Sequence, residues 1–305
     1  MTRIPTLLAF ERTLGAMNER RNALMNNQQQ LASGKRLNSL SDDPLAAAQA
    51  ERTRSQIARL DTEGRMTAFS RHMLSQADNA LGGVGDALQF ARETMVAAGN
   101  GALAPADRTL LAQQLRGARD ELLALANQRD GAGGYVFGGQ GTRSAPFDAQ
   151  ALPVPTYRPT AGEQASGLDA AFATSQDGRA IFSGSGSDAS PDIFQTLDAA
   201  VALLEDPAST GTALSEGVGT ATEGIDSALE RVSLQRTRVG EQLRALDSRD
   251  RLVESGAIEA RGQLSELMDV DYAAAISQFQ GNQTSLEAAM STYAKISRLT
   301  LFDYL

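Results

Sequence analysis

Few residues of this 305-residue chain have the types and spacing that catalytic or metal chemistry requires. The single histidine, His72, has no second histidine with which to form a site, and the chain has no cysteine to serve as nucleophile or thiolate ligand. Asp269 and Asp271 lack the surrounding ligand loop of a metal site, so we interpret them as caps or part of a helix joint. Asp42 and Asp43 fit a helix start better than an acid–base pair.

Two further patterns resemble functional motifs but fall in segments with helical periodicity. Asn282-Gln283-Thr284 matches a glycosylation acceptor, and Gly82, Gly83 and Gly85 lack the preceding strand of a nucleotide-binding fingerprint. No set of nucleophile, base and orienting group can be assembled from the sequence. We therefore predict that the protein is not an enzyme and has no catalytic, cofactor-binding or metal-binding residues.

Composition and charge favour a folded protein of two or three domains, with 42% hydrophobic and 21% charged residues. The net charge of −9 argues against nucleic acid as a partner, and no apolar run is long enough for membrane insertion. Glu11 and Arg12 interrupt the apolar region that a signal peptide needs. Residues 1–44 and 268–305 together are neutral, which suits close packing against copies of themselves.

Apolar residues recur in alternating steps of three and four at both ends of the chain. This heptad spacing predicts a helix over 5–33 and another from Asp269 to Leu305, each with an apolar seam that needs a partner helix. We predict that the two terminal helices pair, and that polar seam residues set their register; the alternative is that each packs on its own domain. The predicted seams are Leu7, Phe10, Leu14, Met17, Arg21, Leu24, Gln28 and Leu31, and Tyr272, Ile276, Phe279, Gln283, Leu286, Met290, Tyr293, Ser297 and Thr300.

Residues 34–43 are predicted to link the first helix to the next one. Gly34 can adopt the left-handed conformation that ends a helix. Asp43 can accept hydrogen bonds from free backbone N–H groups, and Pro44 is tolerated at the first helical position.

Long helices are predicted where the heptad pattern continues without proline. One runs from Leu45 to about Ala98, with Leu60, Leu74, Leu81, Leu88 and Met95 on one seven-residue repeat. A returning helix, marked by Leu111, Leu115, Ala118, Leu122 and Leu125, ends near Asn127. A short helix precedes Pro207, and the pattern then holds for six heptads from Ile225 to Leu267. The pattern slips by one residue at 268–271, where we predict a joint.

The character of the chain changes after Gly131, where glycine, proline and aromatic residues become frequent. A strand or hairpin is predicted at 135–137, and short strands are predicted at 154–158 and 179–183. The predicted fold is mainly α with a small β insertion. A long antiparallel coiled-coil or helical-bundle rod is formed by the N- and C-terminal parts around a nested β-rich centre.

Three domains are predicted from these boundaries. Residues 1–44 with 268–305 form a terminal helical domain, residues 45–142 with 193–267 form the rod with a short β-hairpin, and residues 143–192 form a small β-rich outer domain.

Three segments resemble a known family. MTRIPT at the start and QLASGKRLNSLSDDPLAAAQA at 30–50 resemble the N-terminal signature shared by bacterial flagellins and hook-associated proteins. KISRLTLFDYL at 295–305 resembles the ending of the members that join hook to filament, and YVFGGQGTRSAPF at 135–147 resembles the segment leading into their outer domain. The resemblance covers nearly the whole chain. The match of both termini together is specific, whereas the segment at 30–50 alone does not separate the chain from flagellin.

The resemblance implies a structural subunit of the bacterial flagellum that is extracellular and is exported through the flagellar type III apparatus without a cleaved signal peptide. It implies contacts with the first hook-associated protein on the hook side, with flagellin on the filament side, with copies of itself in a ring-like layer, and with an export chaperone. The assembly residues it implies, each of which could instead be intramolecular core, are Leu7, Phe10, Leu14, Met17, Leu24, Leu31, Tyr272, Ile276, Phe279, Leu286, Met290, Tyr293, Phe302 and Leu305.

Two other functions compete with this one. The chain could be a flagellin, that is, a subunit of the filament itself. It could instead be a cytosolic coiled-coil scaffold, which would explain the heptads and the acidic charge but not the nested β insertion.

Limited proteolysis of the free monomer tests the scaffold alternative. We expect a protease to remove roughly the first 40 and last 40 residues first, because short seams that need neighbours for burial are marginal alone. Mass spectrometry of the remaining fragment gives its ends. A scaffold resists cleavage at both ends.

Overall fold

The computed structural model describes residues 3–302, except residues 40, 142, 149–154, 168–170 and 185–190. Over 3–10 and 295–302 only the helical backbone is described. The chain divides into two compact units, Met1–Leu60 with Ser255–Leu305, and Asp61–Glu254. The predicted fold class, helical with a small β insertion, is confirmed. The division into three domains stays a prediction.

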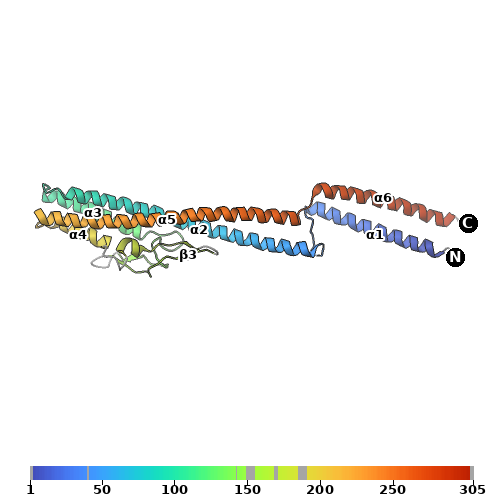
Figure 1. The fold of residues 1–305 in the computed structure, drawn as a ribbon, viewed down its shortest axis with the longest axis horizontal. Coiled ribbons are helices and arrows are strands. Elements are labelled where there is room, and N and C mark those ends of the chain that lie inside the picture. Colours follow the sequence, from blue (N-terminus) through green and yellow to red (C-terminus); the bar gives the residue numbers. More distant parts are fainter. Residues whose placement is uncertain are drawn as a thin grey trace. The chain divides into compact units, whose positions relative to one another are not determined.

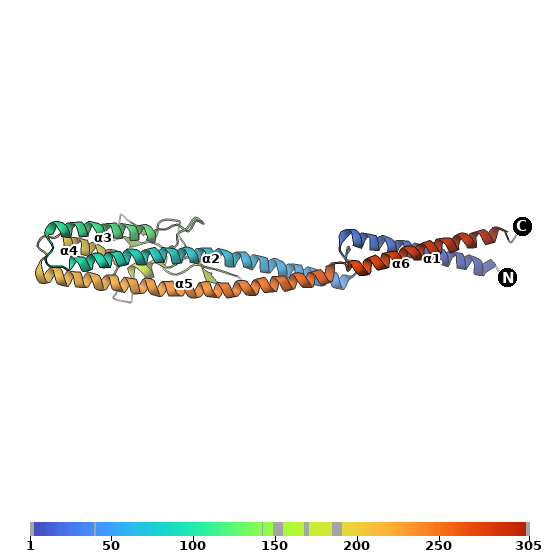
Figure 2. The same ribbon diagram turned by 90° about the horizontal axis from the view of Figure 1, so that it is seen from above.

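The first unit contains the two terminal helices. Helix α1 (Arg3–Ser33) packs against α6 (Tyr272–Phe302), and the two lie side by side with opposite chain directions (Figure 1 and Figure 2). The unit also holds the start of α2 (Pro44–Ala98) and the end of α5 (Gly211–Met268). The predicted terminal pair and the predicted joint between the last two helices are therefore both observed.

The second unit is a helical bundle around a continuous apolar core. Helix α3 (Pro105–Ala126) returns along α2, and α4 (Ile193–Glu205) packs against α3. Two ion pairs, Arg116–Glu205 and Arg119–Asp198, join α3 to α4. The heptad positions predicted from sequence supply much of the core. At most 1% of the surface is exposed at Leu74, Leu81, Leu88, Met95, Leu115, Leu122, Ile225, Val239 and Leu246.

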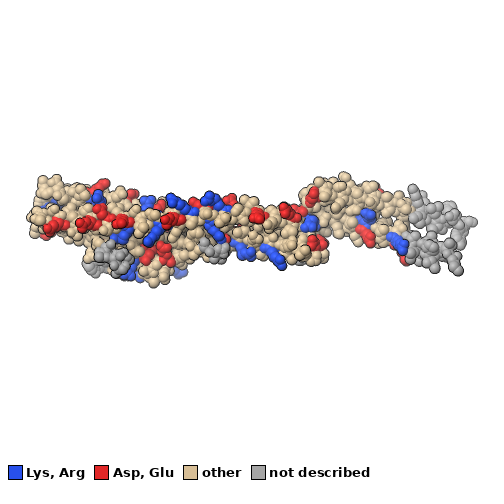
Figure 3. Space-filling view, viewed as in Figure 1, with Lys and Arg blue, Asp and Glu red and all other residues tan. Residues whose placement is uncertain are grey.

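Ion pairs join α2 and α5 along their length in this unit. Arg92 Nε lies 2.6 Å from Asp226 Oδ1, and Arg236 Nε lies 3.1 Å from Asp78 Oδ1. Each exposed pair contributes only about 0–1 kcal/mol. Because each arginine lies opposite an acidic residue of the other helix, these pairs favour one register of α2 and α5 over others. Figure 3 shows basic and acidic side chains interspersed over these two helices.

The insertion contains two small antiparallel hairpins. Strand β1 (Phe147–Asp148) pairs with β2 (Thr156–Tyr157), with Phe147 opposite Tyr157. Strand β3 (Ala165–Ser166) pairs with β4 (Phe172–Ala173), with Ser166 opposite Phe172. The predicted strand at 154–158 therefore contains an observed strand.

The strand predicted at 179–183 is wrong, because Arg179–Ser183 is a short π-helix, η1. Ile181 and Phe182 are neighbours in sequence, yet both are buried. Successive side chains of a strand point to opposite faces, so a strand could not bury both on one side. Phe182 instead packs its ring 5.2 Å from Phe137 and 5.3 Å from Phe147, centroid to centroid.

The segment at 135–137 forms a tight turn beside isolated antiparallel bridges, which is closer to the predicted hairpin than to the predicted strand. Tyr135 pairs with Arg129 and Gly138 pairs with Asp177 in isolated antiparallel bridges, and the Val136 and Phe137 side chains between them are buried. Long-range packing around the aromatic rings determines this local structure.

Leu122→Ala in α3 tests the helical core. We expect it to reduce the free energy of unfolding by about 2–5 kcal/mol, because it leaves a cavity where a fully buried leucine was. Leu110→Ala in the same helix is the matched control, with 58% of Leu110 exposed, and it should change stability by less than about 0.5 kcal/mol. Urea unfolding followed by circular dichroism measures both. Equal losses would contradict the packing described.

Candidate assembly surface

Helices α1 and α6 bury one seam between them, and they bury it incompletely. On α1, the predicted positions Leu14, Met17, Leu24 and Leu31 are half-buried. On α6, Phe279, Leu286 and Tyr293 are half-buried as well. This differs from the bundle of the second unit, where heptad leucines such as Leu81 and Leu122 are fully buried.

The face that α6 turns toward α1 is rotated from the predicted seam. It follows Ala275, Phe279, Asn282, Leu286, Ala289 and Tyr293, of which Ala275 is buried and the others half-buried. The predicted positions Tyr272, Ile276, Gln283 and Met290 lie beside this face and are exposed. Small residues at 275 and 289 allow close approach of the two helices. The predicted seam was therefore wrong at these four positions as a contact within the chain.

The polar residues of the seam also differ from those predicted. Arg21, Gln28 and Gln283 are exposed, whereas Asn27 is buried and Asn282 is half-buried. The Nδ2 atom of Asn27 has no hydrogen-bond partner among the described residues.

Several large apolar side chains of this unit are exposed among the described residues. The exposed fractions are 54% for Tyr272, 46% for Ile276, 55% for Met290 and 59% for Met25. A role in assembly stays a prediction for Tyr272, Ile276 and Met290, whose exposure matches the need of the seam for further helices. The side chains of Leu7, Phe10, Ser297, Thr300 and Phe302, and the whole of Leu305, lie outside the described residues.

A short backbone pairing connects the two points where the helices break. The N–H of Arg36 donates to Met268 O at 2.7 Å, and the N–H of Val270 donates to Gly34 O at 3.0 Å. The Arg36 guanidinium also donates to Leu267 O at 2.8 Å, at the C-terminal end of α5. We call residues 34–36 and 268–270 the clasp. No sequence pattern indicated it, because the pairing joins segments more than two hundred residues apart.

Gly34 enters the clasp in the left-handed region, with φ of +70°. A Cβ atom there would lie 2.9 Å from the Tyr272 hydroxyl oxygen. Both observations favour glycine at this position.

The carboxylates near the joints act as helix caps. Asp43 Oδ1 accepts from the N–H of Ala46 at 3.0 Å, and Pro44 is the first residue of α2. Asp271 Oδ1 accepts from the N–H of Ala273 at 3.0 Å. Asp42 Oδ2 accepts from the N–H of Ser39 at 2.8 Å within the linker. These carboxylates satisfy backbone donors that helix ends and turns leave free.

His72, clusters of possible metal ligands and long apolar helices are the features that could indicate catalysis, metal binding or membrane insertion. His72 Nε2 lies 2.8 Å from Gln76 Nε2, in the same helix. Among the described residues, no group of three or more His, Asp and Glu side chains could hold a metal ion. In the same part of the chain, no helix is long and apolar enough to cross a membrane.

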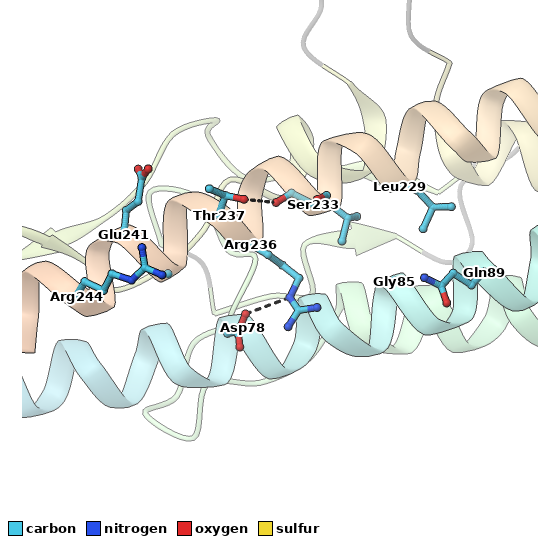
Figure 4. Close-up of a pocket in the computed structure, with 11 residues that line it drawn as sticks. Asp78, Gly85, Gln89, Leu229, Ser233, Arg236, Thr237, Glu241 and Arg244 are labelled. Atoms are coloured by element: carbon cyan, nitrogen blue, oxygen red, sulfur yellow. Dashed lines mark hydrogen bonds and ion pairs between the residues drawn. The ribbon is translucent and has the colours of Figure 1, made fainter.

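A polar groove lies between α2 and α5. Figure 4 shows the Arg236–Asp78 ion pair crossing it, with Glu241 and Arg244 pointing away and Gln89 near Gly85. Ion pairing between the two helices explains the charged residues at its centre.

The insertion is tied to α5 by partly buried polar groups. Arg231 donates to Ile181 O and Pro191 O, both at 3.3 Å, and its burial lowers the pKa of the guanidinium, opposed by the nearby Asp192 carboxylate. Burial, with Asp177 nearby, raises the pKa of Tyr157 to about 12, so its hydroxyl stays protonated at neutral pH.

Comparisons with known proteins agree with this arrangement. A model of the bacterial flagellin N-terminal helical region matches residues 4–142, and one of the C-terminal helical region matches residues 222–305. Flagellar hook-associated protein 3 of Salmonella typhimurium is 31% identical over 313 residues, covering 99% of each chain. Flagellin of Bacillus subtilis is 25% identical over 311 residues, covering 97% of this chain and 96% of its own. The crystal structure of Xanthomonas campestris FlgL superposes with a TM-score of 0.61 at 20% identity, covering 71% of this chain and 99% of that one.

The paired terminal helices and the two matching models define a flagellin-type structural protein of the bacterial flagellum. Within that class, the chain belongs to the family of flagellar hook-associated protein 3. The predicted structural role at the hook–filament junction is thereby confirmed, in preference to flagellin and to a cytosolic scaffold. As a flagellar component, the protein is exported and extracellular.

Phe279→Asp and Leu14→Asp test the terminal pair. A charge in the half-buried seam costs about 2 kcal/mol or more, enough to reduce incorporation into flagella more than tenfold. Helical content by circular dichroism should stay close to that of the unchanged protein, since the second unit has its own core. Gln278→Asp, on the exposed side of α6, is the control and should incorporate normally. Normal filament attachment in either seam variant would count against the pair.

Proposed function

We propose that copies of this chain form a ring-like layer that connects the hook to the filament through their terminal helices. In this layer the chain contacts the first hook-associated protein on the hook side and flagellin on the filament side. The observation that carries the proposal is the incomplete burial of the α1–α6 seam, beside an exposed row of large apolar side chains.

The energetics of burial support assembly through this surface. Fully burying a large apolar side chain stabilises by about 1.5–3 kcal/mol, so completing the burial of Tyr272, Ile276 and Met290 contributes roughly half of that for each. A ring repeats the gain at every copy, and this offsets the cost of ordering the helices.

The distribution of charge supports a layered arrangement of the predicted domains. Residues 1–44 with 268–305 form the inner wall in this proposal, the rod of 45–142 with 193–267 forms the next shell, and 143–192 faces outward. Between Tyr272 and Ala294, Glu287 is the sole charged residue, whereas α2 and α5 carry many charges. A neutral pair suits contact with other helices, and a charged surface suits water.

A route of export is part of the same proposal. The chain passes through the flagellar type III apparatus without a cleaved signal peptide, and an export chaperone covers α6 until assembly. Exposed apolar residues on α6 favour aggregation of a free chain, and this supports the proposal that a chaperone binds α6 before assembly. The role is structural rather than catalytic, because the carboxylates at the joints serve as caps.

Gold-labelled antibody electron microscopy of detached flagella tests the position of the protein. We expect one narrow band of label at the boundary between hook and filament. Label along the whole filament would assign the chain to the flagellins instead, and flagella without label would remove the proposal.

A further inference from the structure

A groove in the first unit lies beside the clasp and has an apolar floor. The groove has a volume of about 830 Å³, and its lining is mostly apolar, with Leu37, Pro44, Ala47, Ala48, Ala50 and Met268 beside the polar residues Asn38 and Ser39. Leu37 is 7% exposed. Its rim carries Lys35, Glu51 and Arg54. The floor suits an apolar side chain, and the rim suits a charge beside it.

The basic residue Lys35 on the rim has no ion-pair partner within the described chain. The Arg54 guanidinium lies 3.3 Å from Glu51 Oε2 and reaches Met268 Sδ at 4.0 Å, so that cation is engaged. None of the ion pairs among the described residues includes the Lys35 ammonium. A carboxylate from outside the chain would complete the rim.

The complementary feature lies on the exposed side of α6. Glu287 is exposed and accepts one long hydrogen bond from Gln283 at 3.4 Å. Met290, one turn further on, is 55% exposed. An apolar, flexible side chain beside a single carboxylate matches the groove in both shape and charge.

Lys35 on the groove rim and Glu287 on α6 cannot contact each other within one chain. Lys35 pairs by its backbone with Asp269, just before α6 begins at Tyr272. Glu287 is fifteen residues further along α6, which corresponds to about 22 Å at 1.5 Å per residue. That separation exceeds the reach of the two side chains, so a contact requires a second copy.

We propose that the groove receives Met290 from α6 of a second copy of this chain, with an ion pair between Lys35 of one copy and Glu287 of the other. The inference rests on the ring-like layer proposed above and specifies how neighbouring copies contact. It is a head-to-tail contact, because the groove and the α6 segment are different surfaces. Such contacts generate rings when the rotation between copies closes.

Charge reversal tests the ion pair. Lys35→Glu and Glu287→Lys should each lower the number of attached filaments about tenfold, because like charges then face each other. The two changes combined should restore attachment, because the pair is rebuilt with its signs exchanged. Losses that multiply in the combined variant, or normal attachment in both single variants, would overturn the proposal.

Disulfide cross-linking tests which molecule occupies the groove, and the absence of native cysteine makes its result specific. Ala48→Cys combined with Met290→Cys should yield a ladder of multiples of this chain after oxidation of isolated flagella. Ala48→Cys with Ala288→Cys is the matched control, since residue 288 is exposed but points away from residue 290 on the helix.

The outcomes separate this contact from the function on which it rests. A missing ladder, an equal ladder in the control, or a product containing another protein overturns the contact even when gold label marks the junction. Absence of the unchanged chain from flagella overturns the proposed function itself.

Discussion

The structure depends on how completely apolar heptad seams are buried. In the second unit, α2 and α5 are covered by α3, α4 and the insertion, so residues such as Leu81 and Leu122 lose all contact with water. In the first unit, α1 packs against α6, and Phe279 and Leu286 remain half-buried. Two helices cannot enclose a core as four can. The first unit is consequently the part of the chain that gains most from neighbours.

The clasp joins the two helix breaks of the first unit. Its backbone bonds hold the break between α1 and α2 against the break between α5 and α6. The pairing satisfies backbone groups that both helix ends would otherwise leave free. It also brings Lys35 to the edge of the groove, so the same few residues shape the pair and its contact surface.

The chemistry of the charged residues is consistent with a building block. Asp43 and Asp271 cap helices, and the arginines along α2 and α5 pair with acids on the opposite helix. Such groups determine where helices start and which register they keep. Membership in the hook-associated protein 3 family gives this architecture its place in the flagellum.

Local sequence by itself indicated where the long helices lie and where they break. It also identified the family through its terminal segments. Proline, glycine and aspartate act on neighbouring backbone, so Gly34, Asp43 and Pro44 could be interpreted without the fold. Heptad spacing likewise predicted the buried line from Leu74 to Met95. These signals are carried by residues a few positions apart.

Only the tertiary structure decided the contacts between distant segments. Two heptad lines on α6 share Phe279, Leu286 and Tyr293, so spacing alone could not choose between Ala275 and Ile276 as the side facing α1. The clasp and the π-helix at 179–183 also depend on partners remote in sequence. Periodicity defines how often a side chain faces inward, whereas packing against a particular neighbour defines which one does.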